Sequence, residues 1–253
     1  MPEEHRLEEK FLSQEAEKRI SSQLDEVEQI EIDIQTDLSK IVQGQADGVS
    51  LTGQGLVIQQ DIRVQEIELQ TDSIAINPFS ALFGQIELNQ PLNAIARITL
   101  TELDINTALD SAFVRKQIQN FELNVDGEIV NFEPEEIKVF LPGDGKIEFR
   151  GKLLLKQMGN TRPLAYTAIA RLPSHSQPAM LEGFNCTEGE GISIELIVAL
   201  MQKAKQLMSI PYFEWEDISF NLKNIEAQKG NLILMLEAQV RQIPSSSTLL
   251  LSP

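Results

Sequence analysis

The sequence predicts an α+β fold in which a long, strongly curved antiparallel sheet wraps around one or two amphipathic or apolar helices. Two observations lead to this prediction. Most of the chain alternates apolar and polar residues with a period of two, which is typical of strands with one buried face. Three longer segments carry helical spacing instead, but they do not alternate regularly with the strands, which disfavours a βαβ fold.

The most apolar stretch of the chain is Ile192–Met208. In its first ten residues only Ser193 and Glu195 are polar, whereas Lys203 and Lys205 follow in its last turns. A helix that is hydrophobic on nearly all sides is normally buried. The apolar run is shorter than the ~18–20 residues that span a bilayer. We therefore expect a helix that is buried at its start and reaches water at its end.

Three further helices are expected. Residues 5–27 present an apolar stripe toward the core, made by Leu7, Phe11, Ala16, Ile20, Leu24 and Val27. The segment 78–84 is a short helix with Phe79, Leu82 and Phe83 on one side. The third helix runs from about Glu102 to Gln119. Thr101 precedes it as N-cap, and Asp104 makes the start close to a capping box.

Strands fill most of the remaining chain, at 29–35, 48–52, 56–60, 61–71, 74–76, 86–89, 92–100, 123–125, 128–132, 135–141, 146–156, 164–172, 180–184, 218–222 and 231–240. The glycines of Gly53–Gly55 predict a turn. In 61–71 the apolar phase changes between Val64 and Ile67, which predicts a bulge that lets the sheet curl. No linker divides the chain, so we expect a single elongated domain over 1–253, with 1–121 and 122–243 as half-domains and 244–253 as a loose tail.

Composition narrows the function. With 253 residues, 42% of them hydrophobic, the chain is long and apolar enough to bury a core. Its formal charge of −17 and lack of a basic cluster exclude a typical nucleic-acid binder. The acidity also repels anionic membranes, so contact with lipid must depend on apolar burial and local basic residues. The first 25 residues are charged throughout and contain no signal peptide. We expect a cytoplasmic protein; a peripheral membrane position and the oligomeric state stay open.

No residue pattern predicts catalysis or a cofactor. One cysteine, Cys186, excludes an internal disulfide, and two histidines make a zinc site improbable. His175 lies between serines in a proline-bounded loop, where adjacent residues do not form a catalytic triad. The glycines at 53 and 55 lack the third glycine and the helix of a dinucleotide site. The prediction is a protein that is not an enzyme and needs no cofactor or metal.

The stretch between Gly48 and Phe113 carries a resemblance. Its segments INPFSALFGQIELNQP (76–91) and TELDIN (101–106) resemble the LmeA-like phospholipid-binding family, in the style of its cyanobacterial members. The resemblance covers about residues 5–120 and extends more weakly to 240. It implies lipid binding. The start of the helix at 102–119 also resembles that of tubular lipid-binding (TULIP-like) domains, in which a curved sheet and a long helix leave an apolar groove for acyl chains.

Two functions follow as hypotheses. In the first, the protein binds or transfers phospholipid or another acyl lipid, with transient membrane contact. The residues expected to line its groove are Phe79, Leu82, Phe83, Phe113, Ile194, Ile197, Val198, Met201 and Met208. Those expected at the headgroup are Arg115, Lys116, Lys203 and Lys205, chosen for their charge, with Arg97 a further basic residue of the same kind. In the second, the protein is a scaffold with a dry core and an acidic surface for partner choice.

Overall fold

The computed structural model of the chain describes residues 2–22, 24–58, 61–77, 87–118, 121–125, 127–157, 159–173, 178–189, 193–199, 202, 212–215 and 218–242. The chain forms two compact units. Unit 1 comprises Met1–Thr99, Pro211–Asn224 and Leu234–Pro253, and unit 2 comprises Leu100–Ile210 and Ile225–Ile233. The organisation as a single domain with two half-domains stays a prediction.

The elements of unit 1 begin with the helices α1 (Pro2–Ser21) and α2 (Leu38–Val42). Its strands are β1 (Gln29–Gln35), β2 (Gln45–Ala46), β3 (Gly48–Ile58), β4 (Ile62–Thr71), β5 (Ile74–Ala75), β6 (Leu92–Thr101), β12 (Tyr212–Trp215), β13 (Ile218–Gln228) and β14 (Asn231–Val240). Strands β6, β13 and β14 continue with some residues into unit 2.

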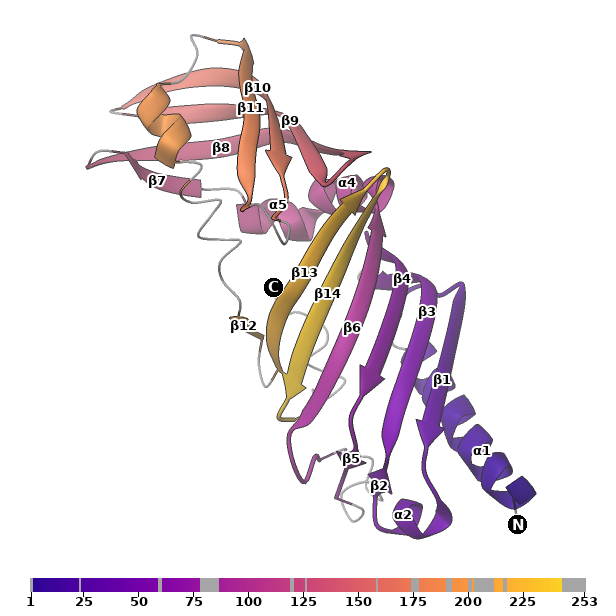
Figure 1. The fold of residues 1–253 in the computed structure, drawn as a ribbon. Helices are drawn as coiled ribbons and strands as arrows, with labels where there is room; N and C mark the ends of the chain where they lie inside the picture. The colour runs from indigo at the N-terminus through magenta and orange to yellow at the C-terminus, as the bar shows by residue number, and fades with distance from the viewer. Residues whose placement is uncertain are drawn as a thin grey trace. The chain divides into compact units, whose positions relative to one another are not determined.

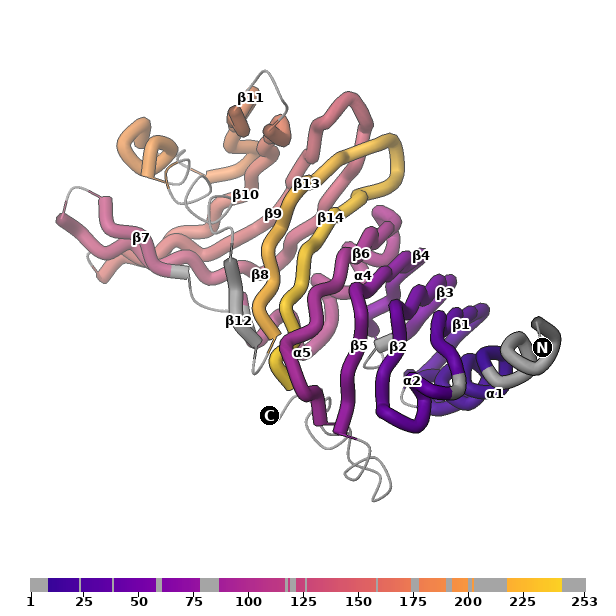
Figure 2. The backbone as a smooth tube through the Cα atoms, turned by 60° about the horizontal axis from the view of Figure 1, so that its bottom comes forward, coloured from indigo at the N-terminus to yellow at the C-terminus, as the bar shows by residue number. Residues whose placement is uncertain are grey.

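The main sheet of unit 1 has seven strands in the order β1-β3-β4-β6-β14-β13-β12. Figure 1 shows them side by side, and Figure 2 shows the sheet curling as it passes from β1 to β13. The paired strands whose register is described are antiparallel. The predicted α+β fold with a curved antiparallel sheet is therefore confirmed.

Two details of the predicted sheet are wrong. The turn at Gly53–Gly55 is absent, because β3 runs through both glycines while pairing with β1 and β4. Gly55 has a φ of 59°, which glycine adopts without strain, so it bends the strand without ending it. The bulge expected between Val64 and Ile67 does not appear as a register shift, since β4 keeps one register with β3 and with β6, but the pairing is interrupted there because no pair joins Gly55 to Gln65. Leu56, which pairs with Val64, and Ile67 both lie close to the Cβ position of Gly53, so the two apolar phases share one face.

Helix α1 ends earlier than predicted, and its buried side combines part of the predicted stripe, Ala16 and Ile20, with polar residues. It stops at Ser21, and Glu26 already forms a bridge to Val57. Phe11, expected in the buried stripe, is 68% exposed, whereas Ser13 is buried. The physical reason is that this helix lies along the edge of β1, where backbone amides need hydrogen-bond acceptors more than they need apolar cover.

Unit 2 contains a five-stranded antiparallel sheet in the order β11-β10-β9-β8-β7. Its strands are β7 (Phe121–Val125), β8 (Glu128–Gly143), β9 (Lys146–Gln157), β10 (Asn160–Arg171) and β11 (Met180–Glu188). The two strands predicted at 128–132 and 135–141 are one strand. The register between β8 and β9 shifts between Pro134 and Glu136, and a bulge of this kind bends a strand without interrupting it.

The helix predicted at 102–119 is two helices, α4 (Glu102–Asp110) and α5 (Ala112–Ile118). The capping box at the start of α4 is confirmed, because the side chains of Thr101 and Asp104 each bond the other residue's backbone N–H. Ser111 separates the two helices. Its buried hydroxyl donates to Ala108 O at 2.6 Å and accepts from Val114 N at 3.2 Å. One serine therefore closes α4 and caps α5.

A hydrophobic cluster lies at each end of one face of this sheet. The first is formed by Leu123, Val130, Phe132, Leu155 and Leu196. The second is formed by Val139, Leu141, Ile147, Leu172 and Ala227, with Ile105 and Leu109 of α4 packed against it. The core of unit 2 therefore lies between this sheet face and the helices that cover its two ends.

The apolar helix expected at 192–208 is described over 194–199 and at 202. Its first turn is capped by Ser193, whose hydroxyl accepts from Leu196 N at 3.3 Å. Leu196 is 2% exposed, but Ile194 is 74% and Val198 45% exposed. The expectation that the start of this helix is buried on all sides is wrong, because only the Leu196 side packs on the sheet.

Candidate functional site

One face of the seven-stranded sheet is apolar across neighbouring strands. Ile32 lies opposite Leu51, Leu51 opposite Leu69, and Leu69 opposite Ala96. Residues that lie opposite one another share a face, and alternate residues along each strand join them. We call this set the apolar face: Ile30, Ile32 and Ile34 of β1, Val49 and Leu51 of β3, Ile67 and Leu69 of β4, and Ala94, Ala96 and Ile98 of β6.

The opposite face of the same strands is polar. It carries Glu31 and Asp33 of β1, Ser50 and Thr52 of β3, Glu66 and Glu68 of β4, and Asn93 and Arg97 of β6. Arg97 faces Glu66, with a nitrogen-to-oxygen distance of 3.8 Å. The exception is Ile95, which is exposed on this polar side. The two sides of one sheet therefore offer different chemistry.

The apolar face extends onto β14. Gln239 donates from Nε2 to Asn93 Oδ1 at 3.4 Å, which places Gln239 on the polar side. The alternation along β14 then puts Leu236 and Ala238 on the apolar side. Although this face is hydrophobic, many of its larger side chains keep part of their surface accessible, among them Leu51, Ile67, Leu69 and Ile98.

Three predicted site residues come together on α5. Phe113 is 38% exposed, and the side chains of Arg115 and Lys116 are also exposed. Arg115 Nη2 bonds Asp110 Oδ1 at 2.9 Å, and Lys138 Nζ reaches Asp110 Oδ2 at 2.6 Å. These contacts, the Lys138 hydrogen bond first and Arg115 second, lower the pKa of the Asp110 carboxyl. The guanidinium of Arg115 thus already has an anionic partner.

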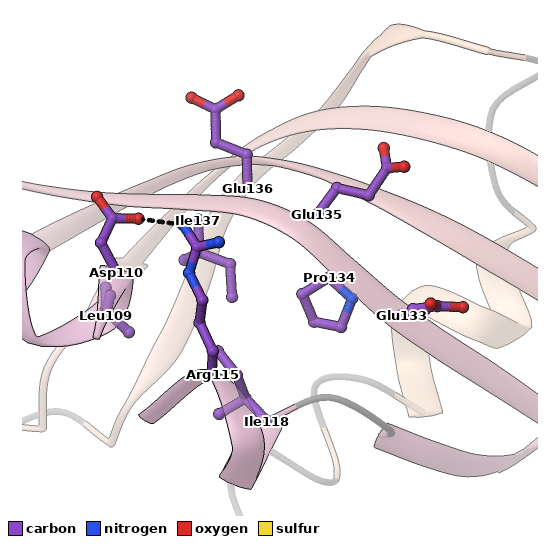
Figure 3. A pocket seen from close by; sticks show the side chains of 9 residues that line it. All are labelled: Leu109, Asp110, Arg115, Ile118, Glu133, Pro134, Glu135, Glu136 and Ile137. Carbon is purple, nitrogen blue, oxygen red and sulfur yellow. Dashed lines mark hydrogen bonds and ion pairs between the residues drawn. The ribbon is translucent and has the colours of Figure 1, made fainter. Parts of the chain in front are cut away.

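A pocket of about 380 Å³ lies where α4 and α5 meet the bulge of β8. Figure 3 shows Arg115 reaching toward Asp110 beside Pro134, whereas Glu135 and Glu136 point away from the pocket. Its lining residues are Leu109, Asp110, Arg115, Ile118, Glu133, Pro134, Glu135, Glu136 and Ile137. The pocket combines an apolar floor with a mostly acidic rim, which is a poor environment for a phosphate group.

The other predicted residues of unit 2 lie elsewhere. Ile194, Ile197 and Val198 belong to the helical segment 194–199, whose Leu196 joins the cluster of β7, β8 and β9. Leu109, next to α5, packs on the other cluster. The two groups of predicted lipid-binding residues are therefore at different ends of the sheet. The remaining predicted positions, Phe79, Leu82, Phe83, Met201, Lys203, Lys205 and Met208, lie outside the described residues.

Residues considered for other chemistry give no site. Cys186 is a free, partly buried cysteine opposite Tyr166 on the neighbouring strand. His175 lies outside the described residues. Within the described part of the chain, no group of three or more His, Cys, Asp or Glu side chains is arranged to hold a metal ion. In the same part, no helix has the length and apolarity needed to cross a membrane.

The predicted lipid-binding residues all came from helices and omitted the apolar face. The signal was present in the sequence, in the alternating isoleucines of β1 and in Ile67 and Leu69 of β4. On its own this alternation predicts only that one side of each strand is covered, and it does not show that these sides form one surface. Comparison with curated proteins and with solved structures gives no match. The model of one protein family matches residues 4–237 of the chain, and the protein therefore belongs to the LmeA-like phospholipid-binding family.

Proposed function

We propose that this protein holds the acyl chains of a phospholipid against the apolar face of the curled sheet. Membership of a phospholipid-binding family supports a lipid ligand. The apolar face offers branched aliphatic side chains over neighbouring strands, and each CH₂ group of a lipid buried there contributes about 0.8 kcal/mol. The polar opposite side of the sheet can stay in contact with water while the apolar face carries lipid.

The observation that carries this proposal is the unequal burial of the apolar face. Ile32, Ala94 and Ala96 are buried, but Leu51, Leu69 and Ile98 retain accessible surface. Apolar surface that the protein leaves accessible gains free energy when a ligand covers it. The exposed part of these side chains is the surface that an acyl chain would cover.

The test compares two isoleucines of β6. Ile98→Gln places an amide on the apolar face, and Ile95→Gln makes the same change three residues earlier, on the polar side. We expect Ile98→Gln to lower the uptake of a fluorescent phospholipid several-fold and Ile95→Gln to leave it unchanged. Native mass spectrometry of the gently purified protein should show co-purified lipid. Absence of both lipid and uptake would contradict the proposal and favour the scaffold with a dry core.

The predicted residues of unit 2 enter the proposal as a membrane contact. Phe113, Ile194 and Val198 expose apolar surface, and Lys116 lies near Phe113 on α5. Side chains of this kind insert into the interfacial region of a bilayer, where a protein must rest while lipid enters or leaves it. Lys116 is then better suited than Arg115 to meet a headgroup phosphate, because Arg115 is paired with Asp110. We propose a binding and transfer role without a catalytic step.

A further inference from the structure

Helix α1 covers the free edge of β1 with polar side chains. The amide of Ile32 donates to Glu17 Oε1 at 3.0 Å, and the amide of Ile34 donates to Ser13 Oγ at 3.3 Å. Both amides point away from β3, on the side where a further strand would pair. Edge strands attract other strands unless they are covered. Ser13 and Glu17 therefore act as substitutes for the carbonyl groups of a missing strand.

The spacing of the two elements explains why this works. Ser13 and Glu17 are four residues apart, a rise of about 6 Å along a helix. Ile34 and Ile32 are two residues apart, about 6.6 Å along a strand. Two side chains one turn apart on α1 therefore have nearly the same spacing as two neighbouring outward-pointing amides of β1. Glu9 and Ser21, which continue the four-residue interval, are also partly buried on this side of α1.

Unit 2 uses the same arrangement at a second edge. Strand β7 pairs with β8 only over residues 128–132, so the later part of β8 has β9 on one side only. Here Glu102 Oε2 accepts from Leu141 N at 2.7 Å, and Asn106 Oδ1 accepts from Val139 N at 2.8 Å. Glu102 and Asn106 are again four residues apart, opposite amides two residues apart.

The two helices differ in how firmly they are held. Asn106 also donates to Val139 O at 2.7 Å, and α4 packs Ile105 and Leu109 on a hydrophobic cluster. On α1, by contrast, the apolar residues Leu12, Ala16 and Ile20 are partly buried but belong to neither of the two hydrophobic clusters described above. Burial of apolar surface is the main stabilising contribution to such packing. Of the two helices, α1 is therefore the one that can detach from the strand edge it covers.

The strand beneath α1 is nearly symmetric in sequence. Residues 29–35 read QIEIDIQ, with Ile32 at the centre, isoleucine two residues away on both sides and an acidic residue next to it on both sides. We propose that release of α1 exposes β1 as a self-complementary edge, and that a second copy of this chain pairs with it in antiparallel register centred on Ile32. The partner is thus another copy of the protein, and α1 controls access to it.

This pairing gives hydrogen-bond partners to the backbone groups on the outer edge of β1, and it extends the apolar face. Ile32 of each copy exchanges two backbone hydrogen bonds with the other, and Ile30 does the same with Ile34 of the second copy. Because opposite residues share a face, the apolar faces of the two copies become continuous. The interface has two-fold symmetry, so the same surface serves both partners. On the polar side, Glu31 lies opposite Asp33 of the second copy, and this like-charge contact opposes pairing.

The first experiment releases α1 in the 253-residue chain. Ser13→Ala with Glu17→Ala removes both acceptors and raises helix propensity, so α1 stays helical. We expect the double variant to dimerise in light scattering and the amides of Ile32 and Ile34 to be protected from hydrogen exchange in that dimer. Gln14→Ala with Lys18→Ala changes two exposed residues at the same spacing and should stay monomeric. A monomeric Ser13/Glu17 variant, or a dimeric control, would overturn the proposal.

Two further variants test the register. Added to the released chain, Glu31→Lys converts both like-charge contacts into opposite-charge pairs and should tighten the dimer about tenfold. Glu68→Lys makes the same charge change on inner strand β4 and should not. In the released chain with Cys186→Ser, a short bifunctional thiol reagent should cross-link two Ile32→Cys copies but not two Ile30→Cys copies. Equal cross-linking at both positions, or no effect of Glu31→Lys, would exclude this register.

Discussion

The ring of Tyr166 occupies the space directly beside Gly151 on the adjacent strand. A Cβ atom at position 151 would lie 2.9 Å from both Cε1 and the hydroxyl oxygen of Tyr166, and 2.6 Å from the carbonyl oxygen of Glu136. The Tyr166 ring is also stacked on Phe184, with 5.9 Å between the ring centroids. Burial raises the pKa of the Tyr166 hydroxyl. A glycine on β9 thus makes room for an aromatic pair on β10 and β11.

Gly151→Ala should therefore destabilise unit 2. The added methyl group meets a backbone carbonyl, which cannot move as a flexible side chain can, and overpacking of this kind costs about 1–3 kcal/mol. The measurement is the free energy of unfolding by urea denaturation. Gly183→Ala is the matched control, because nothing lies within 4 Å of a Cβ built on this glycine of β11. Equal stability of the two variants would show that both the Tyr166 ring and the Glu136 backbone make room for the methyl group at little cost.

Asn106→Ala should destabilise the contact between α4 and β8. The Asn106 amide bonds both the N–H and the C=O of Val139, so its removal leaves two partly buried backbone groups without these partners. Each unsatisfied buried group costs about 1–3 kcal/mol. We expect a loss at the upper end of that range in urea denaturation. Thr107→Ala, which alters the exposed neighbour on the same helix, should change stability by less than about 0.5 kcal/mol.

Much of the sheet was predictable because alternation is a local signal. Strand β14 lies at 231–240 as predicted, and the capping box of Thr101 and Asp104 is visible from the residues alone. Other boundaries depend on distant partners. Gly55 looks like a turn glycine in the sequence, yet β3 continues past it, because β3 pairs with β4 both before and after this residue. No glycine or proline marks the break at Ser111, which follows from burial of its hydroxyl between two helices.

The surfaces were harder to predict than the elements. The sequence shows that Ile32 and Leu69 are on apolar sides of their strands, but not that the register places both on one sheet face. It shows that Ile194, Leu196 and Val198 are apolar, but only tertiary packing decides that Leu196 is the buried one. The roles of Ser13 and Glu17 on α1 are not predictable from the helix itself, because these side chains bond amides of β1 that lie 21 and 15 residues away in the sequence.

Asp110→Asn should make the protein less sensitive to acid. Contacts with Lys138 and Arg115 lower the pKa of the Asp110 carboxyl below 3.8 in the folded protein. A lowered pKa contributes stability above the unfolded value, and this contribution is lost as pH falls through the folded pKa. Because the carboxyl is largely exposed, the difference at pH 7 should be at most about 1 kcal/mol. In urea denaturation the two proteins should converge as pH falls below 3.8, and at pH 7 added salt should narrow their difference.

Ile194→Ser with Val198→Ser tests the proposed membrane contact. Both side chains project from a helix that is anchored through Leu196, so polar replacements should leave the fold intact while removing apolar surface from the membrane side. We expect binding to phosphatidylcholine vesicles, measured by co-flotation, to fall several-fold. Leu103→Ser is the matched control, because Leu103 on α4 is exposed to the same degree as Ile194, at 74%. An equal loss of binding in the control would show that general surface hydrophobicity, and not the helical segment 194–199, governs contact with the bilayer.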